Sequence, residues 1–213
     1  MFYYGKITTR QSRILGVTTE QAIKQSGTEE QNMFDNFNFT NFWDDNDYAM
    51  EEYVAAPPSD ELVASIEQEL GYKLPDSYIW LMKQHNGGIP VNNCFVPASQ
   101  ADRHIDITGI FSISREKACS LCGETGSQFI INEWGYPAIG VAICDCPSAG
   151  HDMVFLDYRK CGSYGEPEVV HIDQECGGKI THLADNFEAF IRGLVNKDYL
   201  EKAKGEVSND EKF

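Results

Sequence analysis

Three short apolar runs in the second half of the chain constrain its fold more than any other feature. They cover residues 139–144, 153–157 and 169–172, and each has the length of a β-strand. Residues 146–152 contain proline and glycine and predict a hairpin turn between the first two runs, and residues 162–167 predict a second turn. Strands joined by short turns pair antiparallel, so the sequence predicts a meander of three strands.

Two helices are expected before these strands. Ser59 is a suitable N-cap for a run whose apolar residues share one face, and Gly71 is suited to end that helix. Pro75 suits the first turn of a second helix, which Asn86 and the two glycines after it would end. We expect the two helices to pack against each other antiparallel.

Further short runs predict additional strands at residues 94–96, 105–113 and 129–131. After residue 185, apolar residues recur at helical spacing as far as Leu194 and predict a last helix that covers one side of the sheet. Helices followed by strands and then a helix indicate the α+β class, with a mainly antiparallel sheet and flanking helices.

Charge divides the chain more clearly than hydrophobicity does. The whole sequence has 17 Lys and Arg against 33 Asp and Glu, a net charge of −16, and residues 25–72 contain no Lys or Arg at all. We therefore predict an N-terminal extension over residues 1–52, a single domain over residues 53–200 and a charged tail over residues 201–213. Within the extension, residues 25–50 mix Asn and Asp with Phe and Trp, which favours docking through aromatic anchors over independent folding.

The same composition argues against several classes of protein. A strongly acidic chain lacks the clustered Lys and Arg that nucleic-acid backbones require, so we expect no direct contact with nucleic acid. No run approaches the roughly 20 apolar residues that cross a bilayer, and the first residues do not read as a signal peptide. The seven cysteines are odd in number, which favours reduced thiols in a cytoplasmic protein.

Five motifs occur in a specific order along the chain. They are LGYKLPDSY at residues 70–78, NGG at 86–88, ITGIF at 107–111, YPAIG at 136–140 and GHDMVFLD at 150–157. In this order the motifs resemble the SUKH superfamily, and more narrowly the bacterial members of the Smi/Knr family of cell-wall regulators. The resemblance extends over about residues 53–194.

This resemblance implies a single α+β domain that serves as a binding scaffold and carries no catalytic residues. Bacterial members of the superfamily often act as immunity proteins that neutralise toxins, many of them nucleases, whereas fungal relatives are linked to cell-wall synthesis and signalling. Most positions that match the family pattern are expected to be structural. They are Leu74, Pro75, Asn86, Gly87, Gly88, Gly109, Pro137, Gly140, Gly150 and Asp157.

Our first hypothesis is therefore a non-catalytic immunity protein that binds a cognate toxin, with a nuclease as the expected kind. A nuclease holds phosphate in a positive groove, and an acidic partner would be steered towards that groove and block it. The alternative is a regulatory or scaffold protein of the cell-wall regulator type that binds a housekeeping partner. The sequence leaves the identity of the partner and the oligomeric state open.

The residues predicted to bind the partner combine negative charge with aromatic anchors, a mixture that suits the rim and the centre of an interface. They are Trp43, Asp44, Asp45, Asp47, Glu51 and Glu52 in the extension, Glu133 and Trp134 in an aromatic loop, and Asp145 and Asp152 beside the predicted hairpin turn.

The cysteines suggest two further hypotheses, a metal site and a catalytic site. Cys119, Cys122, Cys144 and Cys146 could offer zinc four thiolates, but a Cys-x2-Cys pair combined with a Cys-x-Cys pair departs from the usual spacing. Either of the last two could also meet His151 as a nucleophile and base, although the sequence offers no third group to orient the base. We predict no metal, no cofactor and no catalytic residue, and we interpret the other histidines, His104 included, as ordinary side chains.

Overall fold

The computed structural model describes residues 33–99, 103–197 and 200, and the helices and strands discussed below belong to one compact unit that begins at Phe37. Residues 1–32 of the predicted extension and the whole predicted tail, residues 201–213, lie outside the described residues. The α+β architecture predicted from the sequence is confirmed, with helices around two antiparallel sheets.

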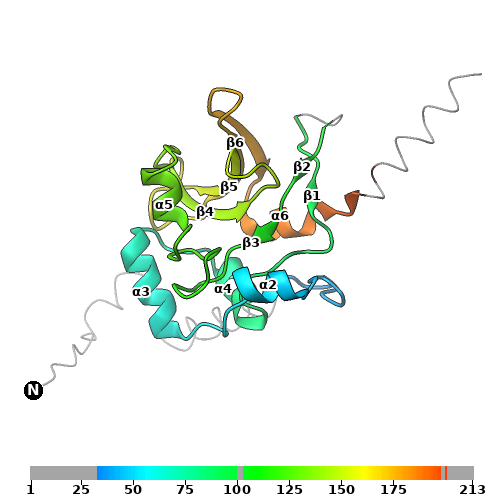
Figure 1. The fold of residues 1–213 in the computed structure, drawn as a ribbon, viewed down its shortest axis with the longest axis vertical. Helices are drawn as coiled ribbons and strands as arrows, with labels where there is room; N and C mark the ends of the chain where they lie inside the picture. The colour runs from blue at the N-terminus through cyan, green and yellow to red at the C-terminus, as the bar shows by residue number, and fades with distance from the viewer. Residues whose placement is uncertain (1–32, 100–102, 198–199, 201–213) are drawn as a thin grey trace, which may run out of the picture. The chain divides into compact units, whose positions relative to one another are not determined.

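The larger sheet has five strands in the order β3-β4-β5-β6-β7, and every neighbouring pair is antiparallel (Figure 1). Its strands are β3 (Gly109–Ile110), β4 (Gly140–Asp145), β5 (Asp152–Asp157), β6 (Glu168–Asp173) and β7 (Lys179–Ala184). The predicted meander is confirmed as β4, β5 and β6. β7, which extends the meander by one strand, was not predicted from the sequence.

A smaller sheet has the order β2-β1-β8 and is also antiparallel. Its strands are β1 (Cys94–Phe95), β2 (Ile105–Asp106) and β8 (Leu194–Val195). Cys94 is the cross-strand partner of Asp106 on one side and of Val195 on the other. This sheet therefore joins the middle of the chain to the segment that follows the last helix.

The described helices are α2 (Asp47–Glu52), α3 (Asp60–Leu70), α4 (Asp76–Gln84), α5 (Ser127–Asn132) and α6 (Phe187–Arg192). The predicted ends of α3 are confirmed, because the Ser59 hydroxyl accepts a hydrogen bond from the Leu62 amide and Gly71 adopts a left-handed φ of 79°. An ion pair of 2.6 Å between Lys83 and Asp60 joins the end of α4 to the start of α3.

The core lies on both faces of the larger sheet, since almost every residue of β4, β5 and β6 is buried. α6 packs against β6 and β7, α5 packs against β4, and α4 packs against α6. Between α4 and α6, the rings of Tyr78 and Phe187 meet edge to face with their centroids 4.8 Å apart. Burying each such side chain contributes about 1.5–3 kcal/mol to stability.

Two of the predicted strands are wrong. Residues 129–131 belong to α5, which follows Gly126, because a run of three apolar residues is too short for its periodicity to distinguish a strand from a helix. Residues 105–113 do not form one strand, since β2 and β3 lie in different sheets. Between them, the Ile107 amide bonds to the Asn93 carbonyl and the Thr108 amide to the Asp145 carbonyl, so the chain changes sheets there.

The last helix also ends earlier than predicted, at Arg192, and Leu194 begins β8. Gly193 allows this change because a Cβ atom there would lie 2.4 Å from the ring of Phe95, so only glycine permits β1 to approach so closely.

Asn86 joins three segments of the buried interior. Its side-chain amide donates to the carbonyls of Ala56 (2.6 Å) and Ile113 (3.2 Å), and its side-chain oxygen accepts from the Ile113 amide (2.8 Å). Its own carbonyl accepts from the Ala55 amide at 3.0 Å. The residue thus links the end of α4 to the segment before α3 and to the chain that follows β3.

We predict that Asn86→Ala lowers the free energy of unfolding by about 2–4 kcal/mol, because buried backbone groups of Ile113 and Ala56 lose their partner. Urea denaturation measures the change. Asn92→Ala, at an exposed position, is the matched control and should stay within about 0.5 kcal/mol of the original protein. Equal stability of the two variants would contradict this role of Asn86.

Candidate functional site

The short helix α2 and the residues before it form an exposed, negatively charged surface. Asn46 caps the helix by accepting a hydrogen bond from the Ala49 amide at 2.9 Å, and Ala49 is the residue that the helix buries. The large side chains of Tyr48 and Met50 remain 54% and 45% exposed. We call the exposed side chains the α2 acidic face, which consists of Asp44, Asp45, Asp47, Tyr48, Met50 and Glu51.

Contacts on either side of α2 hold this face in place. Before the helix, the ring of Trp43 stacks on His85 with the centroids 4.7 Å apart, and the His85 Nε2 atom lies 3.0 Å from the Asp45 carboxylate. At its end, the Lys117 ammonium donates to the carbonyls of Met50 and Glu51 at 2.8 and 3.0 Å. A cation at this position satisfies the last carbonyls and the negative end of the helix.

Directly after α2, Tyr53 is fully buried and donates its hydroxyl to the Asp145 carboxylate at 2.8 Å. The second carboxylate oxygen of Asp145 accepts from the Gly109 amide at 3.1 Å. Burial raises the pKa of Asp145 to about 6, and these two hydrogen bonds offset part of the rise. The contacts give Asp145 a structural role between β4 and α2.

The structure places the residues of the predicted interface in different environments. Trp43, Asp44, Asp45, Asp47, Glu51 and Glu52 come together in and beside α2, although Glu52 is only half-exposed. Glu133 and Trp134 lie in the loop after α5, where Trp134 is 38% exposed and its ring meets Phe129 edge to face. Asp145 binds Tyr53, and Asp152 binds His171 at 2.7 Å, so these two carboxylates make internal contacts.

The structure does not bring the cysteines together in the way that a zinc site of four thiolates would require. Among the described residues, no three of Cys119, Cys122, Cys144 and Cys146 gather as ligands of one ion. Burial raises the pKa of Cys119 to about 11 and of Cys122 to about 12, and it raises the pKa values of Cys144 and Cys146 well above that of an ordinary thiol. At neutral pH all four are therefore thiols and weak nucleophiles.

Among the described residues, His151 does not join Cys144 or Cys146 in the nucleophile–base pair that the sequence left as an alternative. Its side chain is exposed and lies 4.0 Å from Glu175. The Cys146 sulfur instead lies within 4.8 Å of ligand atoms of Asp152 and His171.

A cleft beside β2 is a feature that sequence reasoning missed. It encloses about 310 Å³ and is lined by residues of β2 and of the β5–β6–β7 part of the larger sheet, among them His104, Asp106, Asp152, His171 and Lys179. The available signal was the His-x-Asp spacing at residues 104–106, which places both side chains on one face of a strand. We call this space the β2 cleft.

Comparison with known protein families gives one informative match. The family model SUKH_6, described as SMI1-KNR4 cell-wall, matches residues 60–191, more than half of the 213-residue chain. No curated protein matches the sequence. The matched stretch begins with α3 and ends within α6, so the α2 acidic face lies before it, whereas the β2 cleft lies inside it.

None of the described helices combines the length and the apolar character that crossing a membrane requires.

The raised pKa of Asp145 predicts how stability depends on pH. Because unfolded aspartates titrate near about 3.9, the folded protein holds this proton more tightly than the unfolded chain does. The stability that Asp145 contributes is therefore complete below that pH and is lost as the pH rises through about 6.

We expect the difference in unfolding free energy between the original protein and Asp145→Asn to fall by about 2 kcal/mol between about pH 4 and pH 7. Urea denaturation of both proteins across this range provides the measurement. A difference that grows with pH would mean that Tyr53 and Gly109 outweigh burial.

Proposed function

The chain belongs to the SMI1-KNR4 cell-wall family, and we propose that it is a non-catalytic immunity protein that neutralises a cognate nuclease toxin through the α2 acidic face. The family match supports membership of this family, but it does not identify the partner. The observation that carries the proposal is the gathering of exposed carboxylates in and beside one short helix that also exposes two large side chains, Tyr48 and Met50.

Charge supports this choice of surface. Asp44, Asp45, Asp47 and Glu51 are exposed within a stretch of sequence that has no Lys or Arg from residue 25 to residue 72. A nuclease presents clustered cations to bind phosphate, and an opposite field speeds association and disfavours partners of like charge. Tyr48 and Met50, at the centre of these carboxylates in the sequence, offer the apolar contact that holds an interface together after encounter.

The packing of α2 supports binding as well as folding. Trp43 and Tyr53 fix the two ends of the helix, and Lys117 bonds to its last turn. A surface that is already ordered loses less conformational entropy on binding than a mobile segment does, so more of the contact energy appears as affinity.

A second candidate is a regulatory protein that binds a housekeeping partner of cell-wall assembly. The observation that favours it is the description of the matching family, which names the cell wall. Both candidates use protein–protein binding without catalysis, and they differ in what the partner does.

The test of the proposed function is to capture the partner on tagged full-length protein from a lysate of the source organism, at low and at high salt. Mass spectrometry identifies the captured protein. The immunity function predicts a basic nuclease domain whose activity falls in proportion to added protein. Capture of an enzyme or regulator of cell-wall assembly, with no nuclease inhibited, would favour the second candidate.

Once the partner has been identified, its association rate with variants can be measured. We predict that neutralising Asp44, Asp47 and Glu51 together (to Asn, Asn and Gln) slows association with the partner at low salt by about tenfold or more. The effect should shrink at high salt because screening removes the steering. Stopped-flow or surface-based kinetics gives the rates.

The matched control removes the same charge from other exposed positions, with Asp76→Asn, Glu175→Gln and Asp185→Asn. These residues lie on α4, on the β6–β7 hairpin and after β7. If both variants slow association equally, net charge is responsible and the α2 acidic face is not the binding surface.

A further inference from the structure

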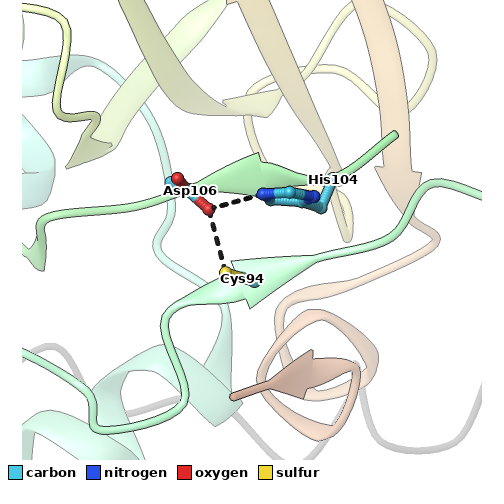
Figure 2. A group of neighbouring side chains, drawn as sticks. All are labelled: Cys94, His104 and Asp106. Carbon is cyan, nitrogen blue, oxygen red and sulfur yellow. Dashed lines mark hydrogen bonds and ion pairs between the residues drawn. The ribbon is translucent and has the colours of Figure 1, made fainter. Parts of the chain in front are cut away.

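Three potential metal ligands meet on one face of the β1–β2 hairpin. Side chains alternate along a strand, so His104, just before β2, and Asp106 point to the same face. Cys94 is the direct cross-strand partner of Asp106, which brings its sulfur beside the carboxylate. Figure 2 shows the three side chains converging, with an oxygen of Asp106 joined by dashed lines to both Cys94 and His104.

The distances among the three ligand atoms are short. The Asp106 Oδ1 atom lies 2.9 Å from the Cys94 sulfur and 3.4 Å from His104 Nε2, and all three atoms lie within 4.8 Å of one another (Figure 2). Around tetrahedral zinc, bonds of about 2.0–2.3 Å place neighbouring ligand atoms roughly 3.3–3.6 Å apart. An ion could therefore enter this group with small side-chain adjustments.

His104 gives an independent reason to expect a ligand here. Its side chain is 23% exposed, and its Nδ1 atom is buried without a hydrogen-bond partner among the described residues. Its Nε2 atom has only the 3.4 Å contact with the Asp106 carboxylate. Buried polar atoms in folded proteins almost always find partners, so an imidazole with so little bonding is exceptional.

We propose that Cys94, His104 and Asp106 form a zinc site at the edge of the β2 cleft. Sulfur, imidazole nitrogen and carboxylate oxygen together form a ligand set that zinc accepts. On binding, the Cys94 thiol releases its proton to solvent and its sulfur bonds to the ion as a thiolate. Three protein ligands would leave a fourth position for water or for a donor atom of a ligand, and two of the three, His104 and Asp106, line the β2 cleft.

Lys197 is compatible with this site. Its ammonium lies 2.5 Å from Asp106 Oδ2, the carboxylate oxygen that the other two ligands do not approach. It thus fixes the orientation of the carboxylate from outside the site, as the outer contacts of metal ligands commonly do.

A second group, Cys146, Asp152 and His171, also lies beside the β2 cleft, and its geometry suits an ion less well. His171 Nε2 and Asp152 Oδ2 are 2.7 Å apart, a complete hydrogen bond that an ion would have to break. In the Cys94 group the imidazole–carboxylate contact is longer, at 3.4 Å, and the hydrogen bond that an ion would replace is that of the Cys94 thiol to Asp106.

A nucleophilic role fits the Cys94 group less well than a metal does. The Cys94 thiol donates a hydrogen bond of 2.9 Å to the Asp106 carboxylate, so its proton is directed at Asp106 rather than at His104. Cys94 is also fully buried, which keeps a substrate from reaching its sulfur. The inference differs from the sequence analysis, which expected no metal, and it does not depend on the proposed function.

The test is a titration of reduced, metal-free, full-length protein with Co²⁺, whose bonds to thiolate produce a charge-transfer absorption band. We expect one equivalent of Co²⁺ to give the band and Zn²⁺ to displace it. Cys94→Ser should abolish the band, and His104→Gln, at a partly exposed position, should weaken Zn²⁺ binding by at least about tenfold. Circular dichroism establishes that each variant folds.

Two controls separate this site from other thiols and imidazoles. Cys176→Ser combined with His151→Gln removes an exposed thiol and an exposed imidazole, and Cys146→Ser alters the second group; both variants should retain the band. The proposal is overturned if the original protein gives no band, if the band persists in Cys94→Ser, or if Cys146→Ser abolishes it.

Discussion

The hydrogen bond from Tyr53 to Asp145 is the contact on which the position of α2 depends. Tyr53 ends α2, Asp145 ends β4, and the same carboxylate accepts from the first amide of β3 at Gly109. A Cβ atom on Gly109 would lie 2.2 Å from the Tyr53 ring, so this packing requires glycine. Three elements thus meet around one partly buried carboxylate, and a helix of six residues, too short to be stable alone, is held on the sheet.

The parts of the fold that the sequence predicts are those with local signals. Ser59 and Gly71 mark the ends of α3, and turn residues separate β4, β5 and β6. α5 was predicted as a strand because three apolar residues carry no periodicity. The change of sheet between β2 and β3 was missed because it depends on bonds from Ile107 and Thr108 to residues distant in the sequence.

The functional residues likewise separate into those that the sequence alone predicts and those that only the fold brings together. The acidic residues around α2 were predicted from composition, whereas the internal contacts of Asp145 and Asp152 depend on how strands pair. Cys94 and Asp106 are twelve residues apart, and only the register of β1 and β2 makes them neighbours. The family match begins at residue 60, so it includes the scaffold and the β2 cleft but not the α2 acidic face. If the α2 acidic face binds the partner as we propose, the surface that selects the partner lies outside the matched stretch.

The measurement that tests the central claim most directly is amide hydrogen exchange of the full chain, free and bound to its captured partner. If the α2 acidic face is the binding surface, binding should slow exchange most strongly in residues 44–52, beyond the protection that Tyr53 and Lys117 already give α2 in the free protein. Unchanged exchange in α2, with new protection confined to the β6–β7 hairpin or the β2 cleft, would contradict the account.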